Sequence, residues 1–174
     1  MQQYQIPLAP GITFIFGSLV LALQADHKLI TMQTNQNITG NAENSHTILL
    51  AEDDADDREL IVDALTIVDN KLNLHTVPDG NSALTYLNKL PKENLPCLIV
   101  LDYNMPDLNG AEVLKHICAD ERYTRIPKVI LSTSNASSYI TECLKYGANQ
   151  YFVKPTSFQE LVNIAKQLVD LCRK

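Results

Sequence analysis

The sequence predicts a doubly wound α/β fold, with helices on both faces of a five-stranded parallel sheet of strand order 2-1-3-4-5. From residue 47 onward, five short apolar runs alternate with five stretches of helical periodicity. The connections between them are short, and right-handed crossovers then require parallel strands. Four of the apolar runs also end in a charged or hydroxyl residue.

The first two strands and helices are predicted over residues 48–87. Residues 48–51 are apolar, too few for a helix, and stop at the acidic run 52–54. The next stretch has the apolar spacing of an amphipathic helix, carried by Leu60, Ile61, Ala64, Leu65 and Val68. Residues 72–77 alternate as an edge strand does, and the Asp-Gly turn at 79–80 precedes a second helix through 83–87.

The remaining elements follow the same alternation. Residues 97–101 are continuously apolar, which is typical of a parallel strand covered on both faces. A helix over 113–118, a strand at 128–131, a helix that ends near Gly147 and a strand at 151–153 follow. Ser157-Phe-Gln-Glu160 is a capping box that opens the fifth helix. Its inward residues are expected to be Leu161, Ile164, Ala165, Leu168, Val169 and Cys172.

Charge and cysteine content narrow the function classes. The chain of 174 residues has a net charge of −6, which gives no general electrostatic reason to bind nucleic acid or anionic lipid. The four cysteines form no C-x-x-C pair and have no histidine at metal-ligand spacing. We therefore expect a cytoplasmic protein, with membrane association unfavourable, and reduced thiols in the core: Cys97, Cys118, Cys143 and Cys172.

The first 45 residues are predicted to be a leader outside the main domain, which spans 46–174. Residues 1–25 are uncharged, with an apolar stretch at 12–23, and the segment that follows is polar and aperiodic. A signal peptide would require a basic residue near its start, but none precedes Lys28. A membrane span of sufficient length would have to include prolines. A weak anchor or a signal peptide stays an alternative, as does a start at Met32.

Polar residues at the carboxyl ends of the predicted strands form the candidate site. They are Glu52, Asp53, Asp102, Ser132 and Lys154. Ligands of open α/β sheets bind outside the carboxyl ends of the strands, at the point where the strand order reverses. Clustered carboxylates with one lysine suit Mg²⁺ and a phosphoryl group, and an aspartate can itself be the nucleophile.

These motifs together resemble the receiver domain of response regulators in two-component signalling, which has a flavodoxin-like fold. The resemblance covers roughly residues 47–172. It is carried by Ile-Leu-Leu-Ala-Glu52-Asp-Asp, Leu-Ile-Val-Leu-Asp102-Tyr-Asn-Met-Pro-Asp-Leu-Asn-Gly, Val-Ile-Leu-Ser132-Thr-Ser and Tyr-Phe-Val-Lys154-Pro. The resemblance implies that Asp102 is the phosphoacceptor.

The resemblance also implies roles for the other residues. Glu52, Asp53, Asp102 and the backbone carbonyl of Asn104 would hold Mg²⁺, and Asp54 would only cap a helix. Ser132, at a position where the family more often has threonine, would move toward the phosphoryl group. Tyr151 would rotate inward when Ser132 moves. Lys154 would pair with a phosphoryl oxygen, and its bond to Pro155 would be cis.

The implied function is that of a stand-alone, chemotaxis-type response regulator rather than an ordinary enzyme, because it would catalyse only its own phosphorylation and dephosphorylation. A sensor histidine kinase would be the phosphodonor, and the downstream protein target is unknown. A phosphorelay intermediate or a phosphate sink would use the same chemistry. One alternative, a phosphatase of the haloacid dehalogenase type, would require a carboxylate at position 104, where this sequence has Asn104. Another, a flavodoxin-like mononucleotide binder, would require a glycine-rich loop at 52–54, where this sequence is acidic.

Overall fold

The computed structural model describes residues 46–174, which form one five-stranded parallel sheet in the order β2-β1-β3-β4-β5. The strands are β1 (Thr47–Ala51), β2 (Asn73–Val77), β3 (Leu98–Asp102), β4 (Lys128–Ser132) and β5 (Gln150–Val153). The central strands are in close register, with Leu50 opposite Val100 and Val100 opposite Val129. The predicted strand number, direction and order are confirmed.

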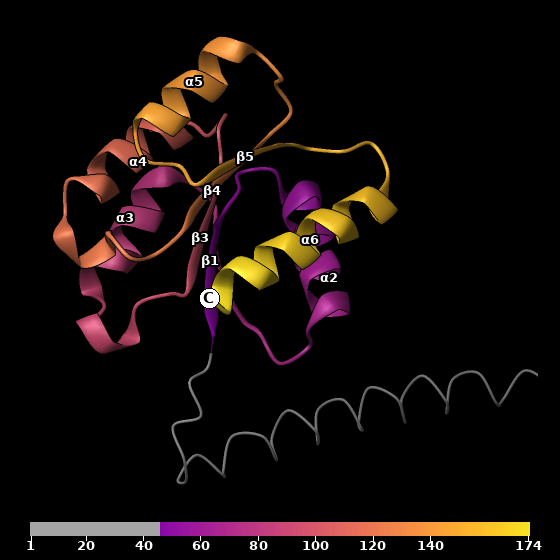
Figure 1. Cartoon of the computed structure of the whole chain (residues 1–174), viewed down its shortest axis with the longest axis horizontal. Helices are drawn as coiled ribbons and strands as arrows, with labels where there is room; N and C mark the ends of the chain where they lie inside the picture. Colours follow the sequence, from indigo (N-terminus) through magenta and orange to yellow (C-terminus); the bar gives the residue numbers. More distant parts are fainter. Residues whose placement is uncertain (1–45) are drawn as a thin grey trace, which may run out of the picture. The chain divides into compact units, whose positions relative to one another are not determined.

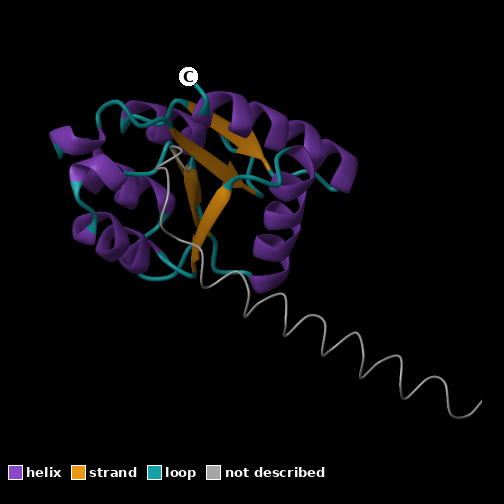
Figure 2. Cartoon of the chain, turned by 90° about the horizontal axis from the view of Figure 1, so that it is seen from below, coloured by secondary structure: helices purple, strands orange, loops and turns teal. Residues whose placement is uncertain are grey.

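Helices cover both faces of this sheet, as Figures 1 and 2 show. They are α2 (Ala55–Val68), α3 (Gly80–Lys89), α4 (Gly110–Cys118), α5 (Ser137–Lys145) and α6 (Phe158–Cys172), with short 3-10 turns at Lys92–Asn94 and Glu121–Tyr123. In Figure 1, α2 and α6 lie on one side of the sheet, and α3, α4 and α5 lie on the other. The predicted doubly wound α/β fold is therefore confirmed.

The core is split by the sheet into two apolar layers. Alternate residues of β1 and β3 enter opposite layers: Leu49 and Ile99 pack toward α3, α4 and α5, whereas Leu50 and Val100 pack toward α2 and α6. Every residue of β3 is buried, as the continuous apolar run predicts for a strand covered on both faces. This rigid centre fixes the strand ends that carry the polar residues.

Local side-chain caps set the helix ends. Asp54 is the N-cap of α2 and accepts hydrogen bonds from the backbone N–H groups of Asp56 and Asp57, as predicted. Ser157 caps α6 and accepts from the Glu160 N–H. Leu60 is the exception to the predicted apolar stripe of α2, since its side chain is 46% exposed. The helix turns Ile61 into the core instead, and each residue step rotates the side chain by about 100°.

Two of the cysteines are bonded to each other, so the prediction of four reduced core thiols is wrong. Cys97, just before β3, and Cys172, at the end of α6, form a disulfide with a Cα–Cα distance of 4.8 Å. Cys143 is a buried free thiol and Cys118 an exposed one. The sequence separation of 75 hides the proximity of the two cysteines, and only the packing of α6 against the sheet brings them together.

Reducing this disulfide is expected to lower the free energy of unfolding by about 2–4 kcal/mol, because the cross-link closes a long loop in the unfolded chain. Urea unfolding with and without a thiol reductant measures the effect. The exposed thiol variant Cys118→Ser is the matched control and should unfold like the wild type. Equal unfolding midpoints with and without reductant would contradict the prediction, provided that thiol counting shows the bond to be present in one sample and reduced in the other.

The predicted leader, 1–45, lies outside the described residues, so its apolar stretch and its boundary at 46 remain predictions. Within residues 46–174, none of the helices combines the length and the apolar character that crossing a membrane requires.

Candidate functional site

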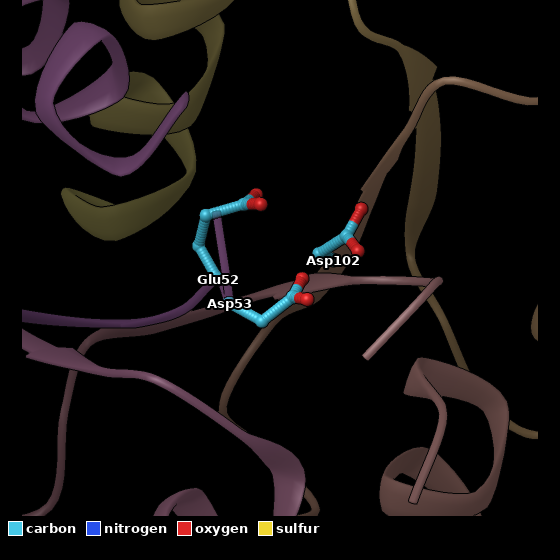
Figure 3. Close-up of side chains that lie close together, drawn as sticks. All are labelled: Glu52, Asp53 and Asp102. Atoms are coloured by element: carbon cyan, nitrogen blue, oxygen red, sulfur yellow. The ribbon is translucent and has the colours of Figure 1, made fainter. Parts of the chain in front are cut away.

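Three carboxylates meet at the carboxyl edge of the sheet, where β1 and β3 end side by side. Glu52 and Asp53 follow β1, and Asp102 is the last residue of β3. One oxygen of each lies within 4.8 Å of the others. Figure 3 shows the three side chains close together, with Glu52 and Asp53 on the segment after β1 and Asp102 at the end of β3. The predicted convergence of the three carboxylates is confirmed, because parallel neighbours end at the same edge.

The three carboxylates differ in burial. Glu52 is 1% exposed and Asp102 3%, whereas Asp53 is exposed, so the cluster opens to solvent through Asp53. Burial raises the pKa of Glu52 to about 7, although Lys154 opposes the shift. Burial also raises the pKa of Asp102. Ionisation of all the carboxyl groups in the pocket is therefore unfavourable unless a cation is bound.

Lys154, which follows β5, points its ammonium into this cluster. Its Nζ lies 2.7 Å from Glu52 Oε2, 2.8 Å from Asp57 Oδ2 and 3.3 Å from Asp102 Oδ1. Burial works to lower the pKa of Lys154, but its contacts with Asp57 and Glu52 outweigh burial and raise the pKa. Lys154 is therefore a fixed positive charge beside Asp102, where the sequence predicted it.

The predicted cis bond between Lys154 and Pro155 is wrong, since no cis peptide bond occurs among the described residues. A different feature places the lysine. The Lys154 N–H donates to the Ser132 carbonyl at 2.7 Å, which extends the pairing of β5 with β4 by one step. That backbone bond holds Lys154 at the sheet edge with a trans peptide.

Ser132 and Tyr151 converge on the loop after β4. Ser132 is fully buried, and its hydroxyl accepts a hydrogen bond from the Ser134 N–H at 3.2 Å. The Tyr151 hydroxyl donates to the Ser134 carbonyl at 2.8 Å. Both side chains therefore hold the same residue, which is what a coupled pair needs. Their predicted movements, inward and toward a phosphoryl group, remain predictions.

Asn104 lies one residue beyond Tyr103 in the loop after β3. Its backbone N–H donates to Asp102 Oδ2 at 2.8 Å, and its side chain is exposed. This bond orients the Asp102 carboxylate while Oδ1 faces Lys154. The predicted role of the Asn104 carbonyl as a metal ligand remains a prediction.

Sequence reasoning missed two residues of α2 that complete the pocket. Asp57 is the second carboxylate partner of Lys154, and Arg58 Nη1 donates to the Glu52 carbonyl at 2.7 Å. Both belong to a charged run that reads as an ordinary helix start with a favourable dipole. Their position in the first turn of the helix that directly follows Glu52 and Asp53 was the available signal.

The residues present fit a hard divalent cation. All donors in the cluster are oxygens, which Mg²⁺ and Mn²⁺ prefer. Glu52 Oε1 is buried and has no hydrogen-bond partner among the described residues, and such an unpaired buried oxygen is costly. Three carboxyl groups, those of Glu52, Asp57 and Asp102, contact the ammonium of Lys154, and a fourth, that of Asp53, lies beside Glu52 and Asp102. A bound cation with its water ligands would supply both a partner for Glu52 Oε1 and positive charge for the carboxylates.

Comparison with known proteins identifies the family. Residues 48–166 match the family model for the response regulator receiver domain. The two-component response regulator ARR7 of Arabidopsis thaliana is 36% identical over 129 residues, which are 70% of this chain and 61% of that protein. The chain thus spans less than two thirds of the length of that relative.

Two solved structures have the same fold. The crystal structure of the phosphorylated cyanobacterial phytochrome response regulator RcpA aligns with a TM-score of 0.67 and 33% identity, over 74% of this chain and 94% of that one. The Mn²⁺-bound form of response regulator Rcp1 aligns with a TM-score of 0.62 and 29% identity, over 70% and 90%. Receiver domains bind a divalent metal at an acidic pocket and take phosphoryl groups from histidine kinases. By its sequence, its fold and its pocket, this chain belongs to the response regulator receiver domain family.

Proposed function

We propose that this protein is a response regulator that accepts a phosphoryl group from a histidine kinase on Asp102. The observation that carries the proposal is the contact set of that carboxylate: Oδ1 lies 3.3 Å from Lys154 Nζ, and Oδ2 accepts the Asn104 N–H. These contacts orient one nucleophilic oxygen and place positive charge where a transferred phosphoryl group needs it.

Glu52, Asp53 and Asp102, with the Asn104 carbonyl, would hold Mg²⁺ in this proposal. The ion would neutralise charge on the phosphoryl oxygens and orient the group for in-line displacement. The acidic cluster, the unpaired Glu52 Oε1 and the Mn²⁺ bound by the similar Rcp1 support this choice.

The transfer step needs only a nucleophile and a counter-charge from this chain. An Asp102 oxygen attacks phosphorus while the bond between phosphorus and the histidine nitrogen of the kinase breaks, and the imidazole keeps the electron pair. Lys154 pairs with an oxygen of the transferred group. Glu52 and Asp57, which hold Lys154 beforehand, keep its ammonium within 3.3 Å of the site of attack.

The output in this proposal is a change of partner binding through Ser132 and Tyr151. The Ser132 hydroxyl donates to the new phosphoryl group and ceases to accept from the Ser134 N–H. The loop then shifts, and the bond of Tyr151 to the Ser134 carbonyl breaks as the ring turns inward. The face formed by α5, β5 and α6 would present the change to a target protein.

Acetyl phosphate tests the proposal directly on the purified protein. With Mg²⁺, we expect the intact mass to rise by one phosphoryl group, and hydroxylamine to remove it, because an acyl phosphate reacts with that nucleophile. With excess chelator, the gain should disappear. A mass that stays constant with Mg²⁺ present, or an adduct that resists hydroxylamine, would count against an aspartyl phosphate.

The metal-free protein is also expected to lose stability as pH rises through about 7. The pKa of Glu52 is raised from its usual 4.5 to about 7 in the folded state, so its contribution is fully present below pH 4.5 and is lost as pH rises through 7. The difference of about 2.5 pKa units corresponds to an upper figure of about 3 kcal/mol. Groups whose pKa is lowered, such as Asp54 and Asp69, change stability only at more acidic pH.

Urea unfolding in chelator at several pH values between about 5 and 8 measures this slope. The variant Glu52→Gln cannot ionise and is the control, in which the slope should flatten. Added Mg²⁺ should restore stability at the alkaline end, because it favours the ionised carboxylates. A wild-type profile as flat as that of Glu52→Gln would disprove the burial argument.

A further inference from the structure

Tyr103, the residue directly after Asp102, makes two contacts with helix α5. Its side chain is buried, at 7% exposure. Its hydroxyl donates to Glu142 Oε2 at 3.1 Å, and its ring stacks on Tyr139 with centroids 4.5 Å apart and planes 19° apart. Burial first, and the Glu142 carboxylate second, raise the pKa of Tyr103, so the hydroxyl keeps the proton that it donates.

The backbone of Tyr103 is tied to the carboxylate of Asp102. The hydrogen bond from the Asn104 N–H to Asp102 Oδ2 spans Tyr103. The Tyr103 carbonyl accepts from the Gly110 N–H at 3.0 Å. Gly110 permits this close approach, since a Cβ there would lie 2.5 Å from the Asp102 carbonyl oxygen. Tyr103 is therefore clamped between the phosphoacceptor and the start of α4.

Phosphorylation would change the strength of this clamp. A carboxylate accepts a hydrogen bond about twice as strongly as a neutral acceptor does. Once one oxygen of Asp102 is bonded to phosphorus in the acyl phosphate, the other is a carbonyl oxygen, and its bond from the Asn104 N–H weakens. The residue most directly affected is Tyr103, because it lies inside the turn which that bond closes.

The Tyr103 contacts reach a different part of the switch region from those of Ser132 and Tyr151. Ser132 and Tyr151 hold Ser134, in the loop before α5. Tyr103 instead contacts α5 itself, at its third and sixth residues, Tyr139 and Glu142. The two routes share no hydrogen bond, so a substitution in one leaves the other in place.

We propose that Tyr103, Tyr139 and Glu142 form a tyrosine bridge that transmits phosphorylation of Asp102 to helix α5, independently of Ser132 and Tyr151. The inference rests on the proposed function, since it requires a modified Asp102. The bridge adds a second connection from Asp102 to the face formed by α5, β5 and α6, which partners would contact. Tyr103 is then a coupling residue that takes no part in the chemistry.

Hydrogen exchange of the α5 amides, 137–145, tests the bridge with beryllofluoride and Mg²⁺ as the activating probe. In the wild type, we expect activation to change the exchange of α5. Tyr103→Phe keeps the stack and removes the hydroxyl, and it should cut that change by about fivefold, the worth of one ordinary hydrogen bond. Tyr123→Phe is the control, since it also removes a buried tyrosine hydroxyl, one without a hydrogen-bond partner among the described residues.

A double-mutant cycle on the unmodified protein tests the contact without activation. Tyr103→Phe and Glu142→Ala each remove the hydrogen bond and should each speed exchange in α5, and the double variant should exchange no faster than the single ones. Additive effects, or a full α5 response to beryllofluoride in Tyr103→Phe, would overturn the bridge while the proposed function stood. Failure of the wild type to bind beryllofluoride with Mg²⁺ would overturn the proposed function and the bridge together.

Discussion

Asp102→Asn is expected to show no phosphorylation by acetyl phosphate under conditions that label the wild type fully. The amide has nearly the same size and can still accept the Asn104 N–H bond, so the fold should persist. Its oxygen is not an adequate nucleophile, and the variant also removes a ligand of the proposed metal. The intact mass after incubation with acetyl phosphate and Mg²⁺ measures the loss.

The matched control for Asp102→Asn is Asp107→Asn in the same loop. Asp107 is exposed, and its backbone has a φ of 64°, a conformation that asparagine also tolerates. We expect Asp107→Asn to be labelled like the wild type and to unfold similarly. An Asp102→Asn protein that is folded and still gains a hydroxylamine-sensitive phosphoryl group would remove Asp102 from its proposed role.

Lys154→Met is expected to have the second large effect, on both stability and phosphorylation. The side chain of Lys154 is 11% exposed and touches three carboxylates. Removing the cation leaves Glu52 and Asp102 buried without a counter-charge, and breaking such a pair costs about 3–5 kcal/mol. We expect the lower end of that range at neutral pH without metal, because Asp57 is partly solvated. Phosphorylation should slow by about 10²-fold, as for other lost electrostatic contacts.

The pH dependence of the Lys154→Met effect separates charge from packing. Near pH 5 the buried Glu52 is protonated in the folded protein, so the lost counter-charge matters less and the destabilisation should shrink. A packing defect would persist at every pH. Urea unfolding at about pH 5 and about pH 8 measures the difference. The control is Lys145→Met, which replaces an exposed lysine at the end of α5. A pH-independent loss of stability, or wild-type phosphorylation, would refute the electrostatic role.

The sequence is sufficient for the sheet and for the centre of the site because both depend on local patterns. Short apolar runs that end in Glu52, Asp102, Ser132 and Lys154 predict strands, and parallel strands bring their ends to one edge. Chain topology alone therefore places residues 50 apart in sequence within 4.8 Å. The helix cap at Asp54, which the sequence analysis also predicted, needs only its own neighbours.

The features that the sequence could not predict depend on how helices rotate and dock. The pairing of Asp57 with Lys154 requires the orientation of α2 against β5. The disulfide requires the end of α6 to meet the start of β3. The contact of Tyr103 with Glu142 requires the placement of α5. None of these has a local periodicity, because each joins elements whose distance is fixed only by tertiary packing.

Crystals of the protein grown with Mn²⁺ and beryllofluoride would test the acidic pocket most directly, through the anomalous signal of the metal. We predict one strong peak within coordination distance of the carboxylates of Asp53 and Asp102, with the beryllofluoride bonded to Asp102 and contacting Lys154. A pocket without a metal peak, or a beryllofluoride group attached to a different residue, would contradict the account.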